Sequence, residues 1–227
     1  MTIAAADTRG IGAAAYADKA ASYFNRPRAD FIGRLPLDKT ARILEIGCGT
    51  GATGALALRT GRCGHYAGVE LFEAAAEEAR GVLSEVVTGD AETMQLPWSP
   101  ASFDALILSE VLEHLVEPGR LLQRLAEVVR PGGIVLASSP NISHWRVIRE
   151  LVAGRFELAD RGVFDRTHLR WFTPGTFADM FERAGFATVD VGPVTPFAAR
   201  TRALSALTGG RLDHMFMVQI AFEGRRR

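Results

Sequence analysis

Short apolar runs alternate with helical segments along most of the chain. The runs that predict strands are 42–46, 65–70, 85–89, 103–109 and 134–138. The segments that predict helices between them are 55–59, 72–83 and 119–129. The run 103–109 is nearly continuously apolar, which is typical of a parallel strand buried on both faces. Because strands and helices alternate through short connections, we predict an α/β fold with a doubly wound, mostly parallel sheet.

The pattern changes at both ends of this region. Residues 1–20 are small and weakly patterned, and a short helix is predicted over 28–35, between Pro27 and Pro36. Beyond residue 142 we expect a helix to about residue 153 and a loop-like segment. Thr173 and Pro174 then begin a helix that Gly185 ends. The segments 187–191 and 214–222 are the last two predicted strands, joined by the long connection 193–213.

A glycine-rich turn follows the first predicted strand. Glycines stand at 47, 49 and 51, so the backbone can turn sharply and free amides can face a ligand. Glu45 precedes the turn, and Glu70 ends the next strand, where an acid can accept both ribose hydroxyls. The turn alone does not identify one class of nucleotide-binding protein. Gly47, Gly49 and Ala52, for example, satisfy the Gly-x-Gly-x-x-Gly/Ala pattern of dinucleotide dehydrogenases.

Composition narrows the possible partners. The 227 residues suit a single domain, and 26 basic side chains balance 26 acidic ones. Overall charge therefore gives no reason to expect nucleic acid or an anionic membrane as a partner. We expect a frayed C-terminus at Arg225–Arg227, no membrane-spanning segment and no secretory signal. Cys48 and Cys63 are predicted to be reduced thiols in a cytoplasmic protein, which would be a monomer or homodimer.

An ordered set of four motifs gives the sequence a family resemblance. The motifs are Glu45-x-Gly-x-Gly-x-Gly, Gly89-Asp90-Ala91, Glu110-Val-Leu-Glu-His114 and Pro131-Gly-Gly. Over roughly residues 40–145 the chain resembles class I S-adenosylmethionine-dependent methyltransferases. The resemblance implies a Rossmann-like sheet of seven strands with an antiparallel C-terminal edge hairpin. It disfavours an NAD-dependent dehydrogenase because of Gly51 and the segment 110–114.

The resemblance also implies a cofactor site for S-adenosylmethionine, with S-adenosylhomocysteine as product. The methionine part would lie against Glu45 and the glycine loop, the ribose against Glu70 and the adenine near Asp90. The residues so implied are Tyr23, Glu45, Gly47, Cys48, Gly49, Gly51, Glu70, Leu71, Asp90, Ala91, Ser109 and Glu110. Tyr23 would belong to a lead-in and helical lid over 1–40, although core packing is the alternative. The methyltransferase domain would span 41–227, with a substrate-loop insertion around 142–173.

The insertion bears on the methyl acceptor. The segment from His144-Trp145 to Trp171-Phe172-Thr173 resembles a bacterial subgroup that occurs among polysaccharide and glycosylation functions. Ubiquinone-type O-methyltransferases and MetW-like proteins are neighbours of that subgroup. A small-molecule or glycan acceptor with a hydroxyl oxygen is therefore implied. An N-methyltransferase and a non-catalytic, MetW-like cofactor-binding partner remain alternatives.

Three histidines are candidates for the catalytic base. Methyl transfer to a hydroxyl is an in-line displacement that needs a proton acceptor, and histidine suits this task near neutral pH. His114, His144 and His168 are all predicted on the strand-end side of the sheet, although each could instead be structural. Asp165 and His168 could form half of a metal site, but no second clear pair is present in the sequence, so no metal is predicted.

Overall fold

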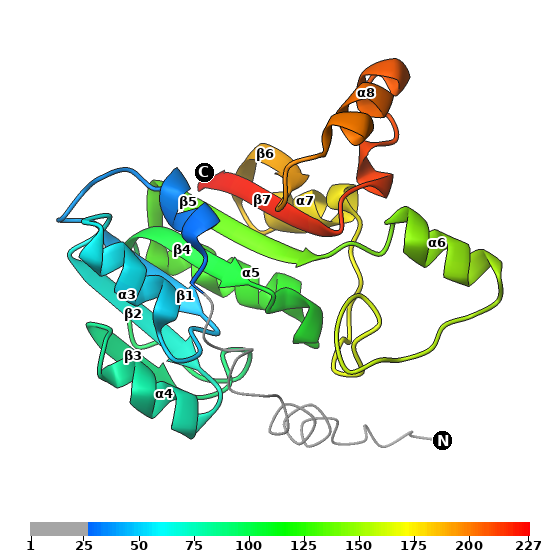
Figure 1. Cartoon of the computed structure of the whole chain (residues 1–227). Coiled ribbons are helices and arrows are strands. Elements are labelled where there is room, and N and C mark those ends of the chain that lie inside the picture. Colours follow the sequence, from blue (N-terminus) through cyan, green and yellow to red (C-terminus); the bar gives the residue numbers. More distant parts are fainter. Residues whose placement is uncertain (1–26) are drawn as a thin grey trace, which may run out of the picture.

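A computed structural model describes residues 27–227 and shows one central sheet with helices on both sides (Figure 1). Tyr23 and the lead-in 1–20 lie outside the described residues, so their predicted roles stay predictions. The proposed boundary at residue 40 is likewise untested. The helix α2 (Ala29–Arg34) nonetheless buries Phe31 and Ile32 in the core.

The sheet contains seven strands in the order β3-β2-β1-β4-β5-β7-β6. Their bounds are β1 Arg42–Ile46, β2 His65–Glu70, β3 Glu85–Thr88, β4 Phe103–Ser109, β5 Val129–Pro140, β6 Phe186–Pro193 and β7 Gln219–Arg226. Strands β1 to β5 pair in parallel, whereas β7 is antiparallel to both β5 and β6. The predicted fold class, including the antiparallel C-terminal hairpin, is confirmed. Strand order reverses between β1 and β4, and ligands of such sheets bind beyond the carboxyl ends of the strands at that point.

Helices cover the sheet through two separate hydrophobic clusters. The remaining helices are α3 Ala52–Arg59, α4 Glu73–Arg80, α5 Pro118–Val128, α6 Trp145–Val152, α7 Pro174–Arg183 and α8 Ala199–Thr208. Short 3-10 turns lie at η2 (Leu112–His114) and η3 (Asp213–Met215). One cluster joins α5 and α7 to the sheet, and the other joins α2 and α3 to its opposite face.

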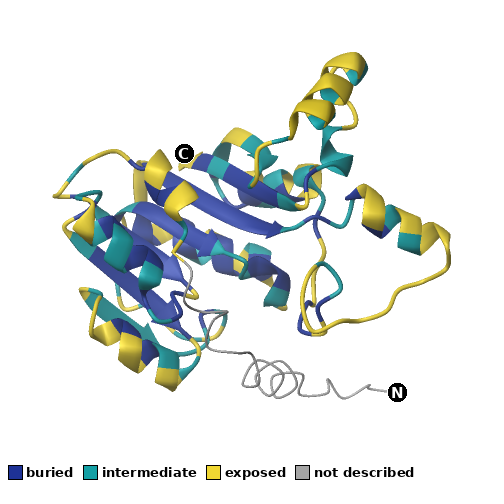
Figure 2. Ribbon diagram, in the orientation of Figure 1, coloured by how far each residue is buried: buried dark blue, intermediate teal, exposed yellow. Residues whose placement is uncertain are grey.

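Strand β1 shows why both faces are covered. Ile43 belongs to one cluster, and Leu44 and Ile46 belong to the other, because successive side chains of a strand point to opposite faces. All three are at most 2% exposed. Figure 2 shows the central strands as the buried layer, with exposed residues concentrated on the outer sides of the helices and in loops. A strand that is buried on both faces contains mostly apolar residues, so the sequence pattern predicted this strand.

Stacked phenylalanines hold α7 against the C-terminal hairpin. The rings of Phe181 and Phe222 stack with centroids 4.1 Å apart, and Phe177 meets Phe181 edge to face at 5.2 Å. Thr173 caps α7 by accepting a hydrogen bond from the Thr176 amide, as predicted for the start of this helix. The hairpin and α7 therefore form one packed unit with the sheet.

Several local predictions in the second half of the chain were wrong. The fifth strand extends over Val129–Pro140 rather than over 134–138, and the last strand begins at Gln219 rather than at His214. The long connection contains α8, which was not predicted. The C-terminus is not frayed, because Arg226 lies in β7 and donates hydrogen bonds to the carbonyls of Ala126 and Gly185. These features depend on contacts with residues that are distant in the sequence, and the local sequence pattern does not indicate such contacts.

Among residues 27–227, no helix combines the length and apolar character needed to cross a membrane.

Candidate active site

The glycine loop, residues 47–51, contacts the carboxyl end of β2. The amide of Gly47 donates to the carbonyl of Val69 at 2.8 Å. Gly47 has φ +70°, and a Cβ there would lie 2.7 Å from Cγ2 of Val111, which follows β4. Gly51, with φ +84°, precedes the first turn of α3. Glycine is thus required at 47 both by backbone conformation and by the close approach of the β4 segment.

Glu70 is fixed at the end of β2 by the loop itself. Its carboxylate accepts hydrogen bonds from the amide of Gly49 at 2.8 Å and from the amide of Phe72 at 3.1 Å. Glu70 is buried, whereas the adjoining Leu71 is 47% exposed. A carboxylate has about four lone-pair sites, so two remain for a ligand. The structure thus brings the predicted residues Gly49 and Glu70 together.

Glu45 lies beneath the loop as a buried carboxyl. Its Oε2 accepts a hydrogen bond from the Tyr66 hydroxyl at 2.9 Å. Burial raises the pKa of Glu45 to about 7, while the hydrogen bonds from Tyr66 and Thr53 act in the opposite direction. Burial, with the nearby charges of Glu45 and Glu70, also raises the pKa of the Cys48 thiol well above its ordinary value. Cys48 is a free and buried thiol.

Ser109 and Glu110 mark the carboxyl end of β4. Glu110 has φ +54°, a left-handed conformation that is uncommon outside glycine. Its Oε2 accepts a hydrogen bond from Gln219 at 2.9 Å, whereas its Oε1 is buried without a hydrogen-bond partner among the described residues. Burial raises the pKa of Glu110, and the polar groups of Ser138 and Gln219 beside the carboxylate oppose this effect. A strained, buried carboxylate with an unpaired oxygen indicates a site for a donor or cation.

Arg28 contacts the carboxyl ends of β4 and β5, and the sequence did not predict this role. Its Nη1 donates to the hydroxyls of Ser109 at 2.5 Å and Ser138 at 2.6 Å. Its guanidinium also pairs with Asp30 at 2.7 Å and lies 3.8 Å above the ring of Phe31. The sequence indicated Arg28 only as a helix start. No local signal could show contacts with residues 81 and 110 positions away.

Asp90 and Ala91 form a turn after β3. The Asp90 carboxylate accepts hydrogen bonds from the Glu92 amide at 2.9 Å and the Thr93 hydroxyl at 3.1 Å. Ala91 is buried, and its carbonyl accepts a hydrogen bond from Arg124 at 3.0 Å. The Asp90 side chain therefore already shapes the turn. Its predicted contact with adenine stays a prediction.

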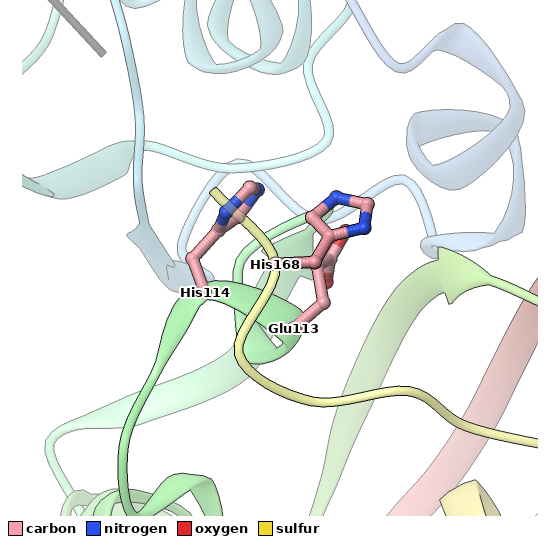
Figure 3. A group of neighbouring side chains, drawn as sticks. All are labelled: Glu113, His114 and His168. Atoms are coloured by element: carbon pink, nitrogen blue, oxygen red, sulfur yellow. The ribbon is translucent and has the colours of Figure 1, made fainter. Parts of the chain in front are cut away.

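Two of the three candidate histidines lie side by side. The rings of His114 and His168 meet edge to face with centroids 4.8 Å apart, and Glu113 lies next to both (Figure 3). His144 is at the start of α6, where its ring centroid lies 5.8 Å from that of Trp145. Burial, followed by the charge of Arg146, lowers the pKa of His144. His168 thus meets His114 and Glu113, and the carboxylate of Asp165 instead accepts hydrogen bonds from Thr167.

Comparison with known proteins decides the family. Residues 17–191 match the family model described as a methyltransferase domain. The chain belongs to this family. It is an S-adenosylmethionine-dependent methyltransferase, as the four sequence motifs implied, and S-adenosylmethionine is its cofactor.

Relatives and solved structures extend over nearly the whole chain. The methyltransferase is 27% identical over 207 residues to a ubiquinone biosynthesis O-methyltransferase of Neisseria meningitidis serogroup C, covering 87% of this chain and 85% of the relative. It is 32% identical over 193 residues to a trans-aconitate 2-methyltransferase of Methylobacterium nodulans, covering 82% and 70%. A methyltransferase structure from Archaeoglobus fulgidus shares the fold, with a TM-score of 0.63, 20% identity and coverage of 90% and 97%.

Proposed function

We propose that this methyltransferase transfers the methyl group of S-adenosylmethionine to a hydroxyl oxygen of a small-molecule or glycan acceptor. The observation that carries the cofactor site is the convergence of the glycine loop, Glu70, Glu110 and Arg28 at the carboxyl ends of the strands on both sides of the β1/β4 switch point. Support for oxygen as the acceptor atom comes from relatives. Ubiquinone biosynthesis O-methyltransferases are among the matching proteins.

The charged groups fit the two ends of the cofactor. Glu70, with two lone-pair sites remaining, would accept the ribose hydroxyls. The unpaired Oε1 of Glu110 would accept from the methionine ammonium, and Arg28 would pair with the methionine carboxylate. Gly47 leaves no room for a side chain between the loop and Val111, which keeps the loop backbone close to the ligand. Glu45 would supply negative charge beneath the loop.

The chemistry requires alignment and a proton acceptor. The oxygen–carbon bond forms as the carbon–sulfur bond breaks, and the hydroxyl proton passes to a base. His144 suits the base because its lowered pKa keeps the imidazole neutral near pH 7. Its place directly after β5 and at the start of α6 puts it at the same edge of the sheet as the cofactor site. His114 and His168 belong to a different cluster.

The test has two parts, starting with the cofactor. Calorimetric titration with S-adenosylhomocysteine should show micromolar binding that is tighter than binding of NAD. Glu70→Gln should weaken this binding at least tenfold, because a neutral amide accepts ribose hydroxyls less well. Glu73→Gln is the matched control, since Glu73 is exposed on α4 and its carboxylate pairs with Arg80 on the same helix. Equal binding by both variants would contradict the assignment of Glu70.

The acceptor is tested by turnover. The enzyme is incubated with S-adenosylmethionine and a panel of phenols, sugars, nucleotide sugars and primary amines. Release of S-adenosylhomocysteine is measured, and the methylated atom is identified by NMR. Methyl transfer to a hydroxyl supports the proposal. Transfer to amines alone, or binding of the cofactor without turnover on any acceptor, would favour the N-methyltransferase or the non-catalytic alternative.

A further inference from the structure

We propose that Glu113, His114 and His168 bind one divalent transition-metal ion. Each residue offers one ligand atom, and the three atoms lie within 4.8 Å of one another. Glu113 and His114 belong to η2, directly after β4, whereas His168 comes from the long segment between α6 and α7. Figure 3 shows the three side chains gathered at the contact between these segments. No helical i,i+4 spacing links them, so the site exists only in the folded protein.

The histidine rings are oriented as metal ligands. Nδ1 of His114 lies 3.1 Å from the carbonyl oxygen of Thr167, and Nδ1 of His168 lies 3.1 Å from that of Val163. A carbonyl oxygen only accepts, so each contact is a hydrogen bond only when Nδ1 carries the proton. In the neutral rings, Nε2 then carries the lone pair. Donation from the second ring nitrogen to a backbone carbonyl is the arrangement that orients histidine ligands of metal ions.

The carboxylate and the backbone around it are also held in place. Oε2 of Glu113 accepts a hydrogen bond from the Ser139 hydroxyl at 3.1 Å. The Glu113 carbonyl accepts hydrogen bonds from the amides of Leu169 and Arg170 at 2.8 and 2.9 Å, which joins η2 to the segment that carries His168. Glu113 is 1% exposed and His168 is 7% exposed. Because the site is buried, water would only weakly screen the attraction between this carboxylate and a bound cation.

The donor set favours a particular class of ion. Two imidazole nitrogens and one carboxylate oxygen suit Zn²⁺, Fe²⁺, Co²⁺ or Mn²⁺ better than Ca²⁺ or Mg²⁺, which prefer oxygen ligands. Zinc–ligand bonds of about 2.1 Å place ligand atoms at most about 4.2 Å apart. Small rotations of the side chains would therefore close the site around the ion. Three protein ligands leave at least one coordination position open.

This inference changes the roles of two candidate bases. An imidazole that binds a metal through Nε2 and donates through Nδ1 cannot accept a proton, so His114 and His168 would be ligands and His144 would remain the candidate base. Two of its ligands, Glu113 and His114, follow Ser109 and Glu110 by three to five residues along the chain, so the ion would lie beside the proposed cofactor site. Metal binding requires neither cofactor nor acceptor, so its failure is distinguishable from failure of the proposed function.

The experiment uses the full chain without an affinity tag, since oligohistidine binds the same ions. The protein is stripped with a chelator and titrated calorimetrically with ZnCl2 and, separately, with MnCl2. Metal content after desalting is measured by mass spectrometry. We expect one Zn²⁺ per chain with micromolar or tighter affinity. The Co²⁺ absorption spectrum should lack a thiolate charge-transfer band, which excludes the thiols of Cys48 and Cys63 as ligands.

Substitutions of the two proposed histidine ligands test whether these residues bind the ion. His114→Gln and His168→Gln should each weaken Zn²⁺ binding at least tenfold, whereas His214→Gln, on η3, should bind as the wild type does. Circular dichroism and S-adenosylhomocysteine binding verify that each variant folds. The proposal is overturned if no ion binds more tightly than at millimolar concentration, or if affinity is unchanged in both ligand variants. A thiolate band that disappears with Cys48→Ser would also overturn it.

Discussion

Replacing Glu45 with glutamine should change how the stability of this methyltransferase depends on pH. Burial raises the pKa of Glu45 to about 7, against an ordinary value of 4.5. Between these values the folded protein binds a proton that the unfolded chain has released. The free energy of unfolding therefore falls as pH rises through this window, because ionising the buried carboxyl costs more than ionising it in water. Glutamine cannot ionise and keeps an acceptor for the Tyr66 hydroxyl.

The size of the effect follows from the two pKa values. At about 1.36 kcal/mol per pH unit, the interval from 4.5 to about 7 corresponds to about 3 kcal/mol. The wild type should lose this amount relative to Glu45→Gln as pH rises from about 4.5 to about 7.5, with little change above that. The positive charge of S-adenosylmethionine would change the pKa of Glu45, so the measurement uses the protein without ligand.

The assay is urea denaturation at half-unit steps from pH 5 to 8 for the wild type and Glu45→Gln. The difference between the two curves is the quantity to examine, because other titrating groups then cancel. Glu127→Gln on α5 is the control for loss of an exposed carboxyl, and its difference from the wild type should not follow the same course. A difference curve for Glu45→Gln that stays flat within 0.5 kcal/mol, or that rises with pH, would refute the reasoning.

Three further predictions concern the packing of α3, cofactor binding and the base. Gly54→Ala should destabilise the protein by about 1–3 kcal/mol in chemical denaturation, because the new Cβ would lie 2.4 Å from the Tyr66 ring; an unchanged midpoint would show that the packing relaxes. Arg28→Ala should lower affinity for S-adenosylhomocysteine by roughly tenfold to a hundredfold in calorimetry, whereas Arg34→Ala should not. If His144 is the base, the acidic limb of the rate profile should have its midpoint below 6.5, because the imidazole must be neutral to accept a proton. A limb unchanged in His144→Gln would exclude this role.

The sequence predicted where the residues of the proposed cofactor site lie in the sheet. The glycines follow the first predicted strand, Glu45 lies near the end of that strand and Glu70 ends the next one. Parallel strands place their carboxyl ends at one edge of a sheet. A local pattern therefore placed residues that are distant in sequence, through the regularity of the fold alone. Arg28 was missed because its partners, Ser109 and Ser138, lie on other elements.

The sequence by itself determined the alternation of strands and helices and the glycine loop, because these depend on local periodicity and on residues that a turn requires. The seven-stranded sheet was implied by the family resemblance. Only the tertiary structure decided that His168 meets His114 and Glu113, although Asp165 lies closer to it in sequence. It also decided that Arg226 lies in a strand, and that Glu110 keeps a buried oxygen without a hydrogen-bond partner among residues 27–227. These features arise where segments far apart in the chain pack together, and no local pattern encodes such a meeting.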